Sequence, residues 1–226
     1  MSLVVLGGSV SPFVRKVRVV LAEKGLDYEH EQVNPFAGPP GWRAVSPLGK
    51  IPAFKDGERT LADSSVICAY LEKRFPTPAL YPSDPYDYAR ALWFEEFMDG
   101  GVVPLVGPKL FFPLVLKPLF SGGQAPDDET EAIAKKTFEE DAAPLFAYLE
   151  QEIGDRDYFV GNQLTIADIT VASIMVNPRH AGYAPSRKKF PKLRAFLDRV
   201  WSRPSLKKLI DEETPVFGKR ADRIND

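Results

Sequence analysis

A proline-rich segment divides this sequence into two parts with different residue patterns. Four prolines fall within the ten residues 76–85. Short apolar runs typical of strands occur before this segment and cease after it, where apolar residues recur at helical spacing. Domain boundaries commonly fall in such linkers. We therefore expect an α/β domain over residues 1–76, a linker over 77–86 and an all-helical domain over 87–226.

The first domain opens on a strand, a turn and a helix. Residues 3–6 have the length and β-branched content of a buried strand, and two glycines end it. Ser11 suits the N-cap of the helix that follows, and Pro12 suits its first position. A serine in this place meets backbone N–H groups and the positive end of a helix dipole, which favour an anion. Ser11 is therefore either a simple helix cap or an anion-binding residue.

The middle of the first domain alternates weak strand patterns with turns. A short polar strand is expected within residues 28–33, and residues 42–45 leave room for a short helix. Residues 51–54 read as a strand that Pro52 interrupts. Asp56-Gly57 is a favoured two-residue turn, so a hairpin is expected there.

Helix starts are marked in both domains by capping residues. Asp63 and Ser64 are good caps for a helix that runs to about residue 75. In the second domain a helix is expected from residue 127 to 154, with a kink at Pro144. Thr165 and Asp168 form a variant capping box ahead of a buried helix, so both are assigned to folding and not to catalysis.

An apolar stretch between residues 102 and 120 contains four prolines and two lysines. Its length invites a membrane-spanning interpretation, but the prolines and charges argue against one. We interpret it as a broken helical arm. Its aromatic residues are either ordinary core or part of a pocket wall.

Composition limits the classes of function. The chain has 226 residues, 44% of them hydrophobic, and a formal net charge of −2, so neither nucleic acid nor a membrane is an expected partner. A single cysteine, Cys68, excludes an intrachain disulfide and a cysteine-based metal cluster. His30 and His180 have no partner at metal-ligand spacing, so no metal is expected. The N-terminus shows no secretory signal, which makes a cytoplasmic location the expectation.

Several motifs together resemble those of soluble glutathione transferases. They are Ser-Pro-Phe-Val-Arg-Lys-Val-Arg (residues 11–18), Pro-Leu-Gly-Lys-Ile-Pro-Ala-Phe (47–54), Asp-Ser-Ser-Val-Ile (63–67) and Leu-Thr-Ile-Ala-Asp (164–168). The first is similar to the serine-type classes, such as the plant tau class, and we expect a bacterial member. The resemblance implies a thioredoxin-like domain followed by an all-α domain, and a detoxification enzyme that forms homodimers.

The resemblance also implies roles for the residues of the first domain. Ser11 would hydrogen-bond to the sulfur of glutathione, the co-substrate, with Ser9 as the competing candidate. Ile51, before a cis Pro52, would pair with the peptide backbone of glutathione. The γ-glutamyl carboxylate would lie on Ser64 and its ammonium group on Asp63, while Lys50 would meet the glycyl carboxylate.

The same resemblance places the second substrate, an apolar electrophile, beside the broken arm. The residues expected to line its pocket are Phe13, Leu110, Phe111 and Phe112. Two classes of function remain. One is a transferase that conjugates glutathione to an electrophile or reduces a peroxide; the other is a non-enzymatic binding module of the same fold.

Overall fold

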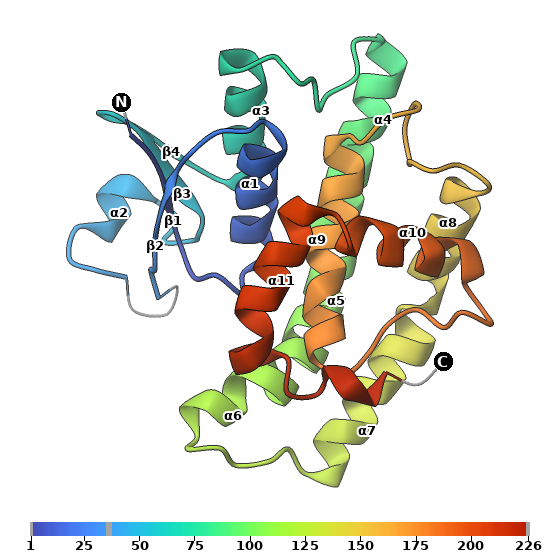
Figure 1. Cartoon of the computed structure of the whole chain (residues 1–226). Coiled ribbons are helices and arrows are strands. Elements are labelled where there is room, and N and C mark those ends of the chain that lie inside the picture. The colour runs from blue at the N-terminus through green and yellow to red at the C-terminus, as the bar shows by residue number, and fades with distance from the viewer. Residues whose placement is uncertain (1, 35–37, 225–226) are drawn as a thin grey trace. The chain divides into compact units, whose positions relative to one another are not determined.

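The computed structural model describes residues 2–34 and 38–224. The chain divides into two compact units, Met1–Pro82 and Ser83–Asp226. The first holds a four-stranded mixed sheet with three helices, and the second is helical throughout (Figure 1). This is the α/β-then-all-α fold that the resemblance predicts.

The sheet of the first unit has the strand order β2-β1-β3-β4. Its strands are β1 (Leu3–Leu6), β2 (Glu29–Glu31), β3 (Ala53–Asp56) and β4 (Arg59–Ala62). β1 and β2 are parallel, and the other two pairings are antiparallel. The helices are α1 (Pro12–Glu23), α2 (Trp42–Val45) and α3 (Ser64–Arg74), and α1 packs on α3.

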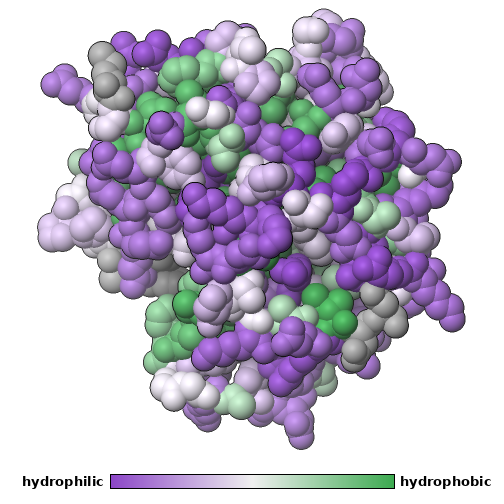
Figure 2. Space-filling view, viewed as in Figure 1, coloured by the Kyte–Doolittle hydropathy of each residue, from purple (hydrophilic) through white to green (hydrophobic). Residues whose placement is uncertain are grey.

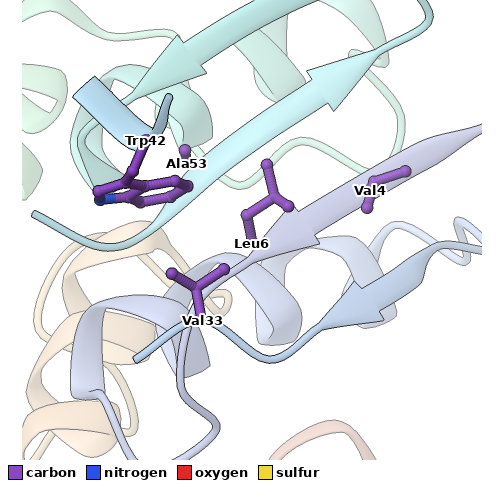
Figure 3. Packing of buried hydrophobic residues seen from close by; sticks show 5 residues of the cluster. All are labelled: Val4, Leu6, Val33, Trp42 and Ala53. Atoms are coloured by element: carbon purple, nitrogen blue, oxygen red, sulfur yellow. The ribbon is translucent and has the colours of Figure 1, made fainter. Parts of the chain in front are cut away.

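Alternation along β1 explains how both faces of the sheet are covered. Val4 and Leu6 lie on one face with Val33, Trp42 and Ala53, and these five residues form a buried apolar cluster (Figure 3). The residue between Val4 and Leu6 points to the opposite face, where it is also completely buried.

The hairpin between β3 and β4 differs from the sequence prediction by one residue. Asp56 pairs with Arg59 at the end of the ladder, so the loop residues are Gly57 and Glu58 and not Asp56-Gly57. Gly57 has a φ of 60°, which glycine adopts without a steric cost. Asp56 stays in the strand because its buried carboxylate accepts a 2.6 Å hydrogen bond from Tyr70 of α3. β3 also begins after Pro52, since proline donates no hydrogen bond to a ladder.

The second unit begins with a continuous run of helical segments. They are α4 (Pro85–Glu96), η1 (Phe97–Val102), α5 (Val103–Val106), η2 (Gly107–Leu116) and α6 (Lys117–Phe120). η1 and η2 have the wide turns of a π-helix. Proline removes the i→i−4 hydrogen bond and crowds the preceding turn, and Pro113 lies inside η2. The broken arm is therefore helical throughout, with its irregularity taken up by wider turns.

By length and composition alone, the run Pro85–Phe120 could cross a membrane. Helices in the core of soluble proteins meet the same criterion, and 33% of its most apolar window is buried inside the structure.

Helices with separate starts make up the rest of the second unit. They are α7 (Asp128–Lys136), η3 (Thr137–Asp141), α8 (Ala143–Ile153), α9 (Ile166–His180), α10 (Pro191–Trp201), α11 (Pro204–Phe217) and the 3₁₀ turn η4 (Ala221–Arg223). The prediction of a single kinked helix over residues 127–154 is wrong. The helix is interrupted at Ala142, and α8 begins as a new helix with Pro144 in its first turn. Proline is favoured at such a start because the first N–H groups have no helical partner.

The buried helix α9 is the centre of this unit and contacts α4, α10, α11 and η2. Its start carries the capping box of Thr165 and Asp168. The Asp168 carboxylate accepts from the backbone N–H groups of Phe159 and Thr165, both at 2.8 Å, and from the Thr165 hydroxyl at 3.0 Å. Burial raises the pKa of Asp168 to about 6, against the opposing effect of these hydrogen bonds.

The surface is mostly polar on the face seen in Figure 2, with smaller hydrophobic patches between the charged residues. Such a mixture is normal for a globular protein, because apolar atoms contribute about half of any folded surface.

Candidate functional site

Three chain segments meet at one edge of the sheet in the first unit. Leu6 ends β1 opposite Ala53, which begins β3, and Ala53 in turn pairs with Ala62, the last residue of β4. Neighbouring strands are about 4.8 Å apart, so the turn after β1, the segment before β3 and the start of α3 span roughly 10 Å. That length suits an extended tripeptide, at about 3.3 Å per residue.

Ser11 lies in the first of these segments as the N-cap of α1. Its Oγ accepts from the backbone N–H of Val14 at 3.4 Å, a long hydrogen bond. The Ser11 hydroxyl donates to no atom of the described residues. The cap and an anion can therefore share this hydroxyl, with the oxygen accepting from α1 and the hydrogen remaining available.

The turn after β1 is held in place by β2 and the residue that follows it. Gly7 donates its N–H to the carbonyl of Glu31 at 2.9 Å, and its own carbonyl lies 2.9 Å from His30 Nε2. The N–H of Ser9 donates to Gln32 Oε1 at 3.1 Å. The hydrogen bonds of Gly7 and Ser9 could not be predicted from the local sequence, because their partners lie more than twenty positions away.

Ile51 and Lys50 lie in the second segment, before β3. The Ile51–Pro52 peptide is cis. The carbonyl of Lys50 accepts from Ser46 Oγ at 2.7 Å, and the Trp42 indole donates to the carbonyl of Gly49 at 3.2 Å. The backbone N–H and C=O of Ile51 bond to nothing in the part of the chain that the structure describes. Those two groups can therefore pair with an added extended peptide.

The third segment starts α3. Asp63 is its N-cap, and Oδ1 accepts from the N–H groups of Ser65 and Val66 at 2.9 and 3.3 Å. Asp63 has a φ of 78°, the only positive value among the non-glycine residues described. Oδ2 of Asp63 and the Ser64 hydroxyl make no hydrogen bond to the described residues. One carboxylate oxygen and one hydroxyl are thus free at a helix N-terminus.

A buried lysine links the two helix starts. Lys16 of α1 donates from Nζ to Ser65 Oγ at 3.1 Å and is almost fully buried. A cation and two helix N-termini at one sheet edge create a positive local potential, which suits a ligand that carries a thiolate or carboxylates. Sequence reasoning missed this lysine, because no local pattern in α1 marks it as facing inward.

The four residues predicted to line the electrophile pocket differ in exposure. Phe13 is half-buried next to Ser11, whereas Leu110 and Phe111 are buried within the helical unit. Phe112 is 40% exposed. Of the three arm residues, Phe112 is the one whose ring is open to a ligand.

Among residues 2–34 and 38–224, no three His, Cys, Asp or Glu side chains lie close enough together to hold a metal ion.

Family models match both units of the chain. The family model of the glutathione S-transferase N-terminal domain matches residues 7–79, and that of the C-terminal domain matches residues 115–213. The chain belongs to the glutathione S-transferase family. All three segments of the sheet edge fall within the first match.

Individual relatives match nearly the whole chain. Glutathione S-transferase 3 of Zea mays is 30% identical over 216 residues, covering 90% of this chain and 91% of that protein. A stringent starvation protein A homolog of Pasteurella multocida is 26% identical and covers 90% and 87%. A glutathione S-transferase from Methylobacterium radiotolerans, solved in complex with glutathione sulfonate, superposes with a TM-score of 0.73 at 26% identity and covers 93% and 95%.

Proposed function

We propose that this protein is a glutathione transferase that binds glutathione along the sheet edge and activates its thiol with Ser11. The observation that carries the proposal is the uncommitted hydroxyl hydrogen of Ser11 at the N-terminus of α1. Family membership and the relative solved with glutathione sulfonate support glutathione as the ligand.

The free polar groups of the edge match those of glutathione in order. The N–H and C=O of Ile51 pair with the cysteinyl backbone. The Ser64 hydroxyl donates to the γ-glutamyl carboxylate at the N-terminus of α3, while Oδ2 of Asp63 accepts from the ammonium group of the same γ-glutamyl residue. Lys50 is exposed and has no partner among the described residues, so it can extend to the glycyl carboxylate.

Activation of the thiol follows from electrostatics at Ser11. A free thiol has a pKa near 8.5, and a hydrogen bond to sulfur together with a helix N-terminus favours the thiolate. The thiolate attacks an electrophilic carbon, a C–S bond forms, and the leaving group departs with its electron pair. With a peroxide, the thiolate sulfur attacks one oxygen, the O–O bond breaks, and the other oxygen leaves as an alcohol after protonation. The thiol of a second glutathione then displaces water from the resulting sulfenic acid and forms the disulfide.

Apolar contacts for the electrophile are assigned to Phe13 and to the arm, where Phe112 carries the exposed ring. Burial against phenyl groups favours an aromatic electrophile and excludes water from the thiolate. Leu110 and Phe111 are buried within the helical unit and leave little surface for a ligand to contact.

We also propose that the protein is a homodimer. Tyr86 and Trp93 of α4 are 73% and 49% exposed, and Tyr88 is also exposed, whereas the neighbouring Phe94 is completely buried. Exposed aromatic residues that cluster on one helix are typical of a protein interface.

Turnover of chlorodinitrobenzene by Ser11→Ala and Ser9→Ala tests the proposal. A hydrogen bond to a charged group is worth about 1.5–3 kcal/mol, so Ser11→Ala should lower kcat roughly 10- to 100-fold with little change in glutathione affinity. Ser9→Ala is the matched control and should retain activity. Glutathione binding without turnover of any electrophile or peroxide by the wild type would instead indicate a binding module.

A further inference from the structure

His30 of the edge strand β2 hydrogen-bonds to the turn that leads to Ser11. Its Nε2 lies 2.9 Å from the carbonyl oxygen of Gly7. A carbonyl oxygen only accepts hydrogen bonds, so the His30 ring must carry a proton on Nε2 and donate it. In the neutral ring this bond selects the tautomer with the proton on Nε2, and the protonated ring carries that proton as well. The donation to Gly7 therefore does not depend on the protonation state of His30.

The turn contains two adjacent glycines, Gly7 and Gly8, and so needs outside contacts to hold one conformation. Glycine loses more conformational freedom on folding than any other residue, and Gly7 has a φ of 156°. The strand β2 supplies these contacts. The Gly7 N–H donates to the carbonyl of Glu31 at 2.9 Å, while the Gly7 carbonyl accepts from His30. Consecutive residues of β2 thus fix both backbone hydrogen-bonding groups of Gly7.

The hydrogen bond of His30 is connected to Ser11 through a single residue, Gly8. The Gly7 carbonyl belongs to the peptide group that joins Gly7 to Gly8. The Gly8 carbonyl in turn accepts from the N–H of Ser11 at 3.1 Å. A rotation of the first peptide group would move the Gly8 carbonyl and change this second bond. His30 therefore helps to set the direction from which the Ser11 hydroxyl meets a ligand.

The helix α1 has a second, separate contact with the segment around β2. Arg18 of α1 donates from Nε to the hydroxyl of Tyr28 at 3.0 Å, and its guanidinium lies 5.9 Å from the centre of the Tyr28 ring. Tyr28 precedes His30 by two residues, and His30 pairs with the completely buried Val5 of β1. Loss of the His30 side chain should therefore loosen the turn while α1 and the sheet remain in place.

We propose that His30 is a positioning residue for thiol activation. Its Nε2–H holds the peptide group between Gly7 and Gly8 so that the Ser11 hydroxyl meets the sulfur of bound glutathione, and the imidazole itself transfers no proton. The inference rests on the proposed function, in which Ser11 stabilises the thiolate. A small displacement of such a group lowers the rate more than the affinity, because the other groups that bind glutathione lie in other segments.

Two amide substitutions separate this hydrogen bond from the other properties of the ring. The Nε2 atom of glutamine is the same number of bonds from Cα as the Nε2 atom of histidine, so His30→Gln can still donate to Gly7. Asparagine ends one atom earlier, so His30→Asn cannot reach the same carbonyl. Both replacements are neutral amides, which makes His30→Asn the matched control for His30→Gln.

Turnover of chlorodinitrobenzene and ultraviolet titration of bound glutathione provide the readouts. His30→Asn should lower kcat about fivefold, the effect of one lost hydrogen bond, and raise the pKa of the bound thiol by about half a unit. The KM for glutathione should change less than about twofold. His30→Gln should keep kcat and the thiol pKa close to those of the wild type. A merely structural role would alter thermal unfolding and leave the thiol pKa unchanged.

Asparagine is depleted in strands, so its effect on folding needs a second variant. His30→Leu also lacks the donor and should show the same loss of kcat and the same rise in the thiol pKa. All assays are run below the unfolding temperature of each variant.

The same comparison in a Ser11→Ala background separates this inference from the proposed function. If His30 acts through Ser11, His30→Asn should have little further effect on the thiol pKa once the hydroxyl is gone. Equal kcat and thiol pKa in His30→Asn and His30→Gln, or an undiminished effect of His30→Asn in Ser11→Ala, would overturn the role of His30 and leave that of Ser11 intact. A thiol pKa and kcat unchanged by Ser11→Ala alone would overturn the proposed function, and this inference with it.

Discussion

A Cβ atom on Gly7 would lie 2.5 Å from Cγ2 of Val14, closer than Cβ atoms approach other side chains in folded proteins. Val14 also donates its backbone N–H to the Ser11 hydroxyl. The absence of a side chain at Gly7 therefore lets the end of β1 pass close under the first turn of α1, which places Ser11 at the sheet edge.

Gly7→Ala should consequently displace the turn and lower both stability and glutathione turnover. Overpacking of this kind costs about 1–3 kcal/mol. Gly8→Ala is the control, because a Cβ there would meet its nearest atoms at ordinary contact distances of 3.6 and 3.8 Å. Thermal unfolding and turnover should separate the two variants, and equal behaviour would show that the close approach has no consequence.

Phe112→Ala should raise the KM for apolar electrophiles several-fold and leave the KM for glutathione nearly unchanged, since this ring is exposed. Phe111→Ala should mainly destabilise the fold, because truncation of a buried phenylalanine costs about 3–5 kcal/mol. Steady-state kinetics with two electrophiles of different size, alongside urea unfolding, distinguishes these effects. An unchanged electrophile preference in Phe112→Ala would show that this ring does not line the electrophile pocket.

Asp168 should make the stability of the helical unit depend on pH. A carboxyl group whose pKa is raised by folding favours the folded state while it is protonated, so its contribution is present below pH 3.8 and lost as the pH rises through about 6. The excess stability of the wild type over Asp168→Asn should thus fall between about pH 4 and pH 7, by up to roughly 3 kcal/mol.

Asp127 serves as a control, because its contribution to stability should change with pH in the opposite direction. The pKa of the carboxyl group of this exposed N-cap of α7 is lowered by hydrogen bonds from the Thr130 side chain and from the Thr130 backbone N–H, the latter at 2.8 Å. The contribution of Asp127 is therefore present above its usual pKa and lost as the pH falls. Urea unfolding extended below pH 3.8 should show the excess stability of the wild type over Asp127→Asn falling as the solution becomes more acidic, whereas its excess over Asp168→Asn falls as the pH rises through about 6. Parallel trends would contradict the account of Asp168.

Light scattering at micromolar concentration should give about twice the 25.2 kDa mass of one chain. Tyr86→Glu should shift the protein toward the monomer, because it introduces a charge on the exposed face of α4. Phe120→Glu, a change at another exposed aromatic residue, should not. A wild-type mass of one chain would rule out the dimer.

The element order of the first unit could be predicted because its signals are local. Ser11 and Pro12 mark the start of α1, and residues 42–45 fit a single short helix between breakers. The hairpin loop lies one residue later than the sequence predicts, because a long-range contact sets its position. The hydrogen bond from Tyr70 keeps Asp56 in the strand.

Other features of the chain depend on tertiary contacts and could not be predicted. The positive φ of Asp63 and the inward position of Lys16 follow from how α1 and α3 pack. A cavity of the helical unit is lined by residues between 131 and 224, whose proximity no local pattern reveals. The sequence predicts only a kink near Pro144 and not the interruption at Ala142, because a proline is compatible with either a kink or a new helix start.

The pKa of glutathione bound to the wild type and to Ser11→Ala, titrated by ultraviolet absorption of the thiolate, tests the central claim most directly. The account predicts a pKa below the free-thiol region near 8.5 in the wild type, and a rise of about one to two units in Ser11→Ala, with glutathione still bound. An equal pKa in the two proteins would contradict the assignment of the thiolate to Ser11.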